Sequence, residues 1–225
     1  MSDIQEKTSL GDNINDFIQK NRKGIFIFLG AAVLLLAVFI GTLGIRNVIR
    51  NKAIVRVEEL SRRYEELRFD IAEESRAEDV AALLAELEDF GAGGYAGARA
   101  RVITAKIHSD KKNWAEAQSA WTGAAKAGAG MYLEPMSFFN AARAAEELGN
   151  KEDAVSLYSQ CLARSGSFPQ AAWAQFSIGR IEESRNNREA ALEAYRTVVS
   201  KWPSDELWVD FAQNRIAVLQ PAVAQ

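Results

Sequence analysis

A run of 22 residues without a charged side chain, residues 24–45, constrains this chain more than any other feature. As an α-helix it would be about 33 Å long, enough to cross a bilayer core of about 30 Å. A soluble core helix of this length would need a polar face, and this run has none. It is also too long for the apolar region of a cleaved signal peptide, and no clean small-residue cleavage site follows it. We predict a membrane-spanning helix over residues 24–45, preceded by a short polar tail over residues 1–23.

Lysine and arginine flank the run on both sides, where their long side chains can reach the two membrane interfaces. The residues before the run carry four cations, and the first 20 residues after it carry six. The six are Arg46, Arg50, Lys52, Arg56, Arg62 and Arg63. Counting lysine and arginine alone slightly favours a C-terminal part that stays in the cytoplasm, yet large domains cross membranes largely regardless of charge. The charges therefore leave the orientation open.

Composition removes several classes of function. The 225 residues include one cysteine, Cys161, and one histidine, His108. Disulfides within the chain, histidine-based metal clusters and histidine-assisted nucleophilic catalysis therefore lack the residues they need. The net charge of −3 gives no reason to expect nucleic-acid binding. We expect no enzyme, no cofactor and no metal, and we expect Cys161 and His108 to have structural roles.

The sequence after the run has the spacing of helices. Apolar residues recur three and four positions apart over residues 54–71 and again over residues 80–87, and the glycines of residues 91–94 end the second stretch. We predict connecting amphipathic helices over residues 46–94. Because no stretch alternates with a period of two, the predicted fold class is all-α.

A period of 37 residues runs through the rest of the chain. On one helix face, a small residue is followed by an aromatic residue and then by another small or medium residue: Ala117, Trp121 and Ala124, then Ala154, Tyr158 and Cys161, then Ala191, Tyr195 and Val198. The small residues let a neighbouring helix approach closely, and the ring fills the groove between the helices. Each such helix follows another one, with Pro135 and Pro169 suited to the first turns of two of these. We predict three helical pairs over residues 95–203, and a capping helix and tail over residues 204–225.

These positions resemble the tetratricopeptide repeat, whose second helix carries glycine, alanine, tyrosine and alanine in a fixed register, followed by proline. One repeat matches at Gly149, Ala154, Tyr158 and Cys161, and the next matches at Asn186, Ala191, Tyr195, Val198 and Pro203, with Ile178 and Gly179 in its first helix. The repeats are about three residues longer than usual, and the first lacks the turn glycine. The resemblance covers about residues 95–220. It implies a solenoid of helical hairpins, the fold of a protein-binding scaffold.

In such solenoids the first helix of each pair lines the concave face. The eight candidate binding residues on that face are Val102, Phe139 and Phe176 in an apolar row, Lys106, Arg143 and Arg180 in a basic row one turn further on, and Met136 and Trp173 near the starts of their helices. They could grip a peptide through apolar contacts and through bonds to carboxylates. Alternatively, the apolar row belongs to the core, and Glu146 and Glu183 pair with the arginines three residues before them.

The order of the parts resembles the YfgM-type family of bacterial proteins. A polar tail, one span, an amphipathic helix, the short stretch VAALLAEL and the segment GGYAGARARVITAKIHSDKKNWAEA are followed by degenerate repeats. Members of this family are ancillary subunits of the SecYEG translocon, with a cytoplasmic N-terminus and a periplasmic repeat domain, and they partner with chaperones of the PpiD type. The resemblance implies a single-pass protein of the bacterial inner membrane with its C-terminal domain in the periplasm.

The repeat surface and the lack of a catalytic set favour a membrane-anchored scaffold that binds proteins. From the resemblance we expect it to assist newly exported polypeptides at the Sec translocon, together with periplasmic chaperones. The alternative is an adaptor for cell-envelope assembly or division complexes unrelated to secretion. The sequence leaves the oligomeric state open, although the aromatic residues Trp208 and Phe211 of the last helix could serve a dimer.

Overall fold

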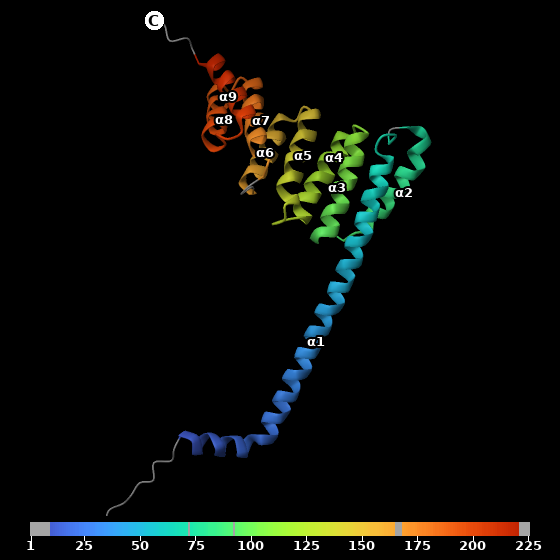
Figure 1. Cartoon of the computed structure of the whole chain (residues 1–225), viewed down its shortest axis with the longest axis vertical. Coiled ribbons are helices and arrows are strands. Elements are labelled where there is room, and N and C mark those ends of the chain that lie inside the picture. Colours follow the sequence, from blue (N-terminus) through green and yellow to red (C-terminus); the bar gives the residue numbers. More distant parts are fainter. Residues whose placement is uncertain (1–9, 72, 92, 165–167, 221–225) are drawn as a thin grey trace, which may run out of the picture. The chain divides into compact units, whose positions relative to one another are not determined.

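The computed structural model describes residues 10–71, 73–91, 93–164 and 168–220, and all regular elements within them are helices (Figure 1). The all-α prediction is confirmed. By its contacts the chain divides into two compact units, residues 1–52 and residues 53–225. Residues 1–9 of the predicted N-terminal tail and residues 221–225 of the predicted C-terminal tail lie outside the described part.

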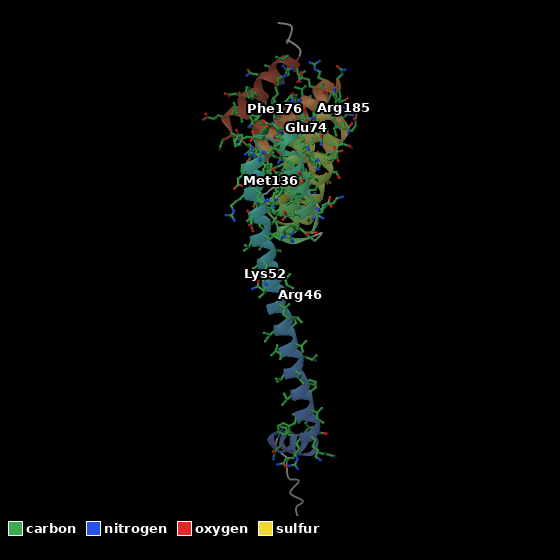
Figure 2. The ribbon with its side chains drawn as sticks, turned by 90° about the vertical axis from the view of Figure 1, so that its right-hand side faces the viewer. Arg46, Lys52, Glu74, Met136, Phe176 and Arg185 are labelled. Carbon is green, nitrogen blue, oxygen red and sulfur yellow. The ribbon has the colours of Figure 1, made fainter. Side chains whose placement is uncertain are left out.

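The N-terminal unit is formed by the first part of helix α1 (Leu10–Leu67). Its apolar side chains have no protein around them: Phe26 and Phe28 are each 73% exposed and Leu35 is 71% exposed. The region Phe17–Leu67 is long and apolar enough to cross a membrane, which makes it a candidate span, although a signal sequence near an N-terminus meets the same criteria. Arg46 and Lys52 follow the apolar run on the same helix (Figure 2).

The second unit begins with the last turns of α1, which share a core with α2 (Ala77–Glu88) and α3 (Gly94–Asp110). A short 3₁₀ helix, Glu74–Arg76, precedes α2. The amphipathic spacing seen in the sequence accounts for this core, because the buried side chains recur every three or four residues. They are Val57, Leu60 and Tyr64 from α1, Val80, Leu83 and Leu87 from α2, and Ala100, Ile103 and Ile107 from α3.

Helical pairs make up the rest of the unit. The pairs are α3 with α4 (Trp114–Ala127), α5 (Leu133–Glu147) with α6 (Lys151–Arg164), and α7 (Ala171–Ser184) with α8 (Arg188–Lys201). Each of these helices packs against the next, and α9 (Glu206–Leu219) packs on α7 and α8. This successive packing is the solenoid of helical hairpins expected from the sequence (Figure 1). Pro135 is the third residue of α5, whereas Pro169, expected in the first turn of its helix, lies two residues before α7.

The turn inside each pair repeats the same backbone conformation. One residue in each has a left-handed φ: Lys112 at 58°, Gly149 at 76° and Asn186 at 63°. The amide of the following asparagine donates to the carbonyl oxygen five residues before it, at 2.8 to 2.9 Å in all three turns. This bond satisfies a carbonyl that the helix end would leave without a partner. The first turn therefore closes in the same way as the second, although it has lysine where the second has glycine.

Small and aromatic residues of the second helices form the contacts between neighbouring helices. All nine positions of the repeated pattern are at most 5% exposed, including Trp121 at 5% and Tyr195 at 0%. Close approach is tightest at Gly179 in α7, where a Cβ atom would lie 2.6 Å from the ring of Tyr195. The ring of the second helix therefore sets how near the first helix of the same pair can come.

Candidate functional site

The eight candidate residues fall into different environments. Val102 in α3 and Phe139 in α5 are only 1% and 4% exposed, so they belong to the core. The ring of Phe139 packs edge-on against Tyr158 of the same pair, with centroids 5.6 Å apart. For these two residues the structure shows the alternative that the sequence had left open. The other six remain accessible: Lys106, Met136, Arg143, Trp173, Phe176 and Arg180.

One cavity brings together three of the accessible residues. It has a volume of about 370 Å³, and Lys106, Met136 and Arg143 contribute to its lining. Tyr64 and Asp110 line the same cavity, from the end of α1 and the end of α3. The cavity therefore lies on the first-helix side of the second unit, between elements that are far apart in the sequence.

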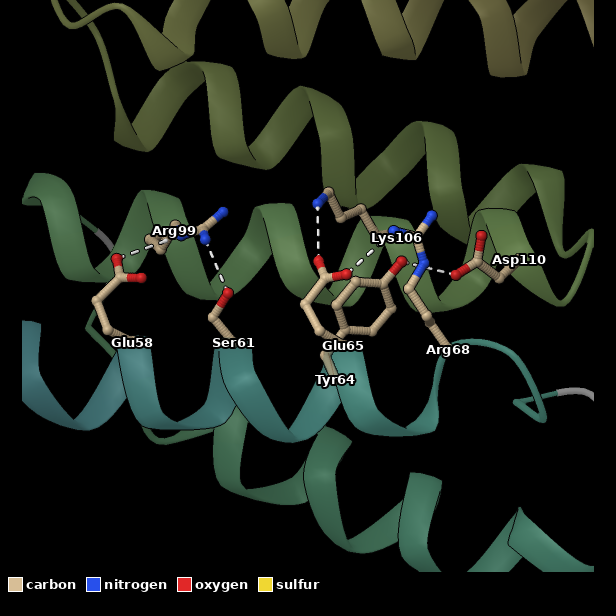
Figure 3. Close-up of polar contacts among 8 residues, drawn as sticks. All are labelled: Glu58, Ser61, Tyr64, Glu65, Arg68, Arg99, Lys106 and Asp110. Carbon is tan, nitrogen blue, oxygen red and sulfur yellow. Dashed lines mark hydrogen bonds and ion pairs between the residues drawn. The ribbon is translucent and has the colours of Figure 1, made fainter.

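Lys106 already has partners at the end of α1, beside this cavity (Figure 3). Its Nζ atom lies 3.6 Å from Glu65 and 5.4 Å from the centre of the Tyr64 ring. Arg68 donates to the same Glu65 carboxylate at 3.0 Å, and the Tyr64 hydroxyl donates to Asp110 at 2.7 Å. Burial, together with this bond to Asp110, raises the pKa of Tyr64. Lys106, the first residue of the basic row, is therefore already in contact with the α1 side chains Glu65 and Tyr64.

Arg180 is paired as well, but not on its own helix. It donates to Glu146 of the preceding repeat, and the same carboxylate accepts a bond from the hydroxyl of Tyr158 at 2.7 Å. Burial and the nearby charge of Glu146 raise the pKa of Tyr158, so the hydroxyl stays protonated and donates. The alternative that Arg180 pairs with Glu183 on its own helix does not hold, because Arg180 pairs with Glu146 of α5 instead.

Glu183 repeats this arrangement one pair later. It accepts from the hydroxyl of Tyr195 at 2.9 Å and from Nε of Arg215, on α9, at 3.1 Å. The bonds from Arg215 lower the pKa of Glu183, and burial partly opposes them. Phe176, Arg180 and Glu183 line a second cavity of about 430 Å³ at this place. Glu146 and Glu183 thus each join a tyrosine of their own pair to an arginine of the next element.

The first repeat breaks this pattern. The position 37 residues before Glu146 is Ser109, whose hydroxyl donates to the carbonyl of Ala105 at 2.7 Å and accepts from Nε1 of Trp121 at 3.3 Å. The arginine that follows in the pattern is Arg143. Among the residues that the structure describes, Arg143 forms no ion pair, and its guanidinium lies over the ring of Trp173 at 5.6 Å. The candidate binding residues predicted from the sequence did not include Ser109, Glu146 and Glu183, although these three positions are also 37 residues apart.

Aromatic rings continue from Trp173 toward the C-terminal helix. Trp173 stacks on Trp208 of α9, with centroids 5.5 Å apart and an angle of 13° between the planes. Phe176 and Phe211 both contact Trp208, and Phe211 is 46% exposed. These rings join the core of the middle repeats to that of the last pair and leave apolar area open to a partner.

Neither of the residues considered for chemistry lies in this region. Cys161 is fully buried in the core, where burial raises the pKa of its thiol to about 12. Burial lowers the pKa of His108 on α3. Within the described ranges no cluster of three histidine, cysteine or acidic side chains is placed to hold a metal. The site offers charge, apolar area and hydrogen bonds, which are the means of binding a polypeptide.

Comparison with known proteins agrees with this description. Residues 104–167 and 139–206 match the tetratricopeptide repeat family, in agreement with the successive helical pairs of this part of the chain. Proteins of this repeat class are generally interaction modules without catalytic activity. A similar protein is the TPR repeat-containing protein of Treponema pallidum (strain Nichols), 35% identical over 138 residues. That match covers 60% of this chain and 57% of the relative, so the chain spans a little over half of the relative's length. No solved structure gives a significant match.

Proposed function

We propose that this chain is a single-pass inner-membrane protein whose tetratricopeptide repeats act in the periplasm as a scaffold for other proteins. It would assist newly exported polypeptides at the Sec translocon, together with a periplasmic chaperone. The observation that carries the scaffold role is the accessible face of α3, α5 and α7, where Lys106, Arg143 and Arg180 lie beside Met136, Trp173 and Phe176. The translocon, the chaperone and the compartment are inferred from the resemblance to the YfgM-type family.

An anchor on the same chain gives this surface an advantage. Because α1 carries a candidate span, the repeats would stay at the membrane where exported chains emerge. Tethering of this kind raises the effective concentration of a weak binding site, to about millimolar for a short link. A weak and permissive groove would then be sufficient for contact with many different polypeptides.

Crosslinking in native membranes tests the partners. With photo-reactive groups at Met136 and Phe176, we expect to capture Sec subunits, a periplasmic chaperone or exported chains. A matched group at exposed Glu189, on α8, controls for proximity. Capture of envelope-assembly or division proteins instead would support the alternative adaptor role. Recovery of none of these from folded protein would contradict the scaffold proposal.

Protease protection in spheroplasts tests the orientation. We expect the repeats to be digested from outside, because the proposal places them in the periplasm. Protection of residues 53–225 until the membrane is dissolved would place them in the cytoplasm and overturn the proposed location. The size of the chain in membranes also tests the anchor, because removal of a signal sequence would shorten it.

Reversal of charge tests the face itself. The double variant Arg143→Glu and Arg180→Glu should weaken partner capture, because it replaces two cations of the face by anions. The double variant Arg196→Glu and Lys201→Glu on α8 makes the same charge change at two exposed positions away from this face and should retain capture. Both should keep their helical signal. Equal capture by the wild type and the first variant would show that Arg143 and Arg180 do not contribute to the binding surface.

A further inference from the structure

Arg143 occupies a position whose partner is missing. In the two following steps of the solenoid, an arginine binds a glutamate of the preceding repeat, and that glutamate also accepts from a tyrosine. At the first step the glutamate is replaced by Ser109 and the tyrosine by Trp121. The two changes fit each other, because a serine leaves room for the larger indole and can accept from its N–H group. Together these two replacements remove the carboxylate that would otherwise pair with Arg143.

The space that this carboxylate would fill is open. Ser109, Trp121 and Arg143 all line the same cavity of about 370 Å³. In the other two repeats the corresponding carboxylates belong to the chain itself, Glu146 and Glu183. We propose that this cavity binds an acidic side chain of a partner polypeptide, whose carboxylate pairs with Arg143 in the place that Glu146 and Glu183 occupy in the other repeats. The inference rests on the proposed scaffold role and specifies the chemistry of its ligand.

The charges around the cavity favour this occupant. Arg68, Lys106 and Arg143 contribute three cations to its lining, against the two acids Asp110 and Glu147, and Glu65 pairs with both Arg68 and Lys106. Arg143 is therefore the cation of this lining that no ion pair of the described structure holds. Asp110 already accepts a bond from Tyr64, so part of its charge is engaged. The guanidinium of Arg143 lies over Trp173, which holds it through the ring face and leaves its N–H groups available to an incoming carboxylate.

Glu147 is the competing group within the chain. It lines the cavity, lies four residues after Arg143 on α5 and is exposed, yet it forms no ion pair with this arginine in the described structure. A partner carboxylate must therefore compete with Glu147, which carries the same charge. Removal of this charge is a sensitive test, because it should tighten binding without adding any new contact.

Apolar residues beside the acidic one would complete the ligand. Trp173 stacks on Trp208, and Trp208 also makes an edge contact with the exposed Phe211. A segment with an acidic residue flanked by leucines could place its carboxylate at Arg143 and an apolar side chain on these rings. This combination of a cation with aromatic rings favours segments that contain both acidic and apolar residues over purely acidic segments.

The test uses the full chain in phospholipid nanodiscs and a fluorescein-labelled peptide of about ten residues, with two glutamates flanked by leucines and both ends blocked. The matched probe has glutamines in place of the glutamates. By fluorescence anisotropy the wild-type chain should bind the glutamate probe about tenfold more tightly, the range of a charge-assisted hydrogen bond. Arg143→Gln should remove this preference, whereas Arg180→Gln should keep it because Glu146 already occupies that arginine.

Two further variants sharpen the outcome. Ser109→Glu restores the missing carboxylate within the chain and should abolish the preference, while Glu147→Gln should increase it. Equal binding of the two probes, no binding of the glutamate probe, or a preference that survives Arg143→Gln would each overturn the proposal. A third probe with glutamines and a free C-terminal carboxylate distinguishes the two sources of the charge, and a preference for it over the blocked glutamate probe would refute the side-chain form.

The scaffold role is tested separately. If Arg143→Gln retains the capture of proteins in native membranes but the probes show no preference, the carboxylate site fails and the scaffold stands. Failure of the wild-type chain to capture any protein in native membranes would contradict the scaffold role, whatever the probes show.

Discussion

Arg180 of α7 binds Glu146 of the preceding repeat, and not Glu183, which lies three residues further on its own helix. The bond therefore ties one repeat to the next. It also fixes the carboxylate that Tyr158 needs, because the tyrosine hydroxyl donates to the other oxygen of Glu146 at 2.7 Å. A pair that would have been local on a solvated helix is instead part of the packing between repeats.

Neutralising Arg180 should lower stability more than the same change at Arg143. In Arg180→Gln we expect a loss of about 1 kcal/mol or less, because the arginine side chain is 53% exposed and water screens the pair. Arg143→Gln breaks no ion pair of the described structure and removes only the contact with the Trp173 ring, so its loss should be smaller. Urea unfolding of both variants, followed by circular dichroism, measures the difference. Equal losses would show that the bond to Glu146 contributes no more than the contact of Arg143 with Trp173.

Lys112 should be replaceable by glycine with a gain in stability. Its φ of 58° is left-handed, which costs an L-residue about 1 kcal/mol and costs glycine nothing. Asn186→Gly should gain less, because asparagine tolerates this conformation better than lysine. Gly149→Ala, at the equivalent turn, provides the opposite control and should lose about 1 kcal/mol. Melting temperatures of the three variants should rank in this order.

Cys161 should be inert in the folded protein. Its side chain is fully buried, and burial raises the pKa of the thiol to about 12, so the reactive thiolate is nearly absent at pH 8. A thiol reagent should label it only after denaturant has unfolded α6. Rapid labelling of native protein at pH 8 would show that the middle repeats open far more often than their packing suggests.

Stability should decrease as the pH falls below about 6.5, the ordinary pKa of histidine. Burial lowers the pKa of His108 in the folded state, an effect that Glu116 opposes and Lys111 supports. Between the ordinary pKa and this lower one, the unfolded chain binds a proton that the folded chain does not, so unfolding is favoured. Melting of the wild type and of His108→Gln between pH 7.5 and pH 5 measures the effect, which the variant should lack.

Much of the fold was readable from the sequence because its signals are local. The period of Ala154, Tyr158 and Cys161 with their counterparts identifies second helices whose small faces must be buried. The apolar run likewise predicts the helix α1, because a stretch of this length without charged residues is compatible with few structures other than a helix. Helix ends were less certain, as Pro169 shows by preceding its helix instead of beginning it.

The candidate site was less readable because its contacts join different repeats. The spacing of Val102, Phe139 and Phe176 is regular, yet two of these side chains are core and the third is half-buried beside α9. Sequence spacing gives the face of a helix but not the neighbour that covers it. The partners of Arg180 and Arg143 are Glu146 and Trp173, 34 and 30 positions away, which a search within one helix cannot find.

The uneven size of the cores has a consequence for how the chain opens. The middle repeats share one large cluster, whereas α8 and α9 rest mainly on a small one, and Ala212 is the buried residue of α9. Fraying should therefore start at the C-terminal helix, with amide hydrogens of α9 exchanging earlier than those of α5. The Trp173–Trp208 stack lies at this boundary, so a polypeptide held there would slow the exchange of α9 in proportion to its occupancy.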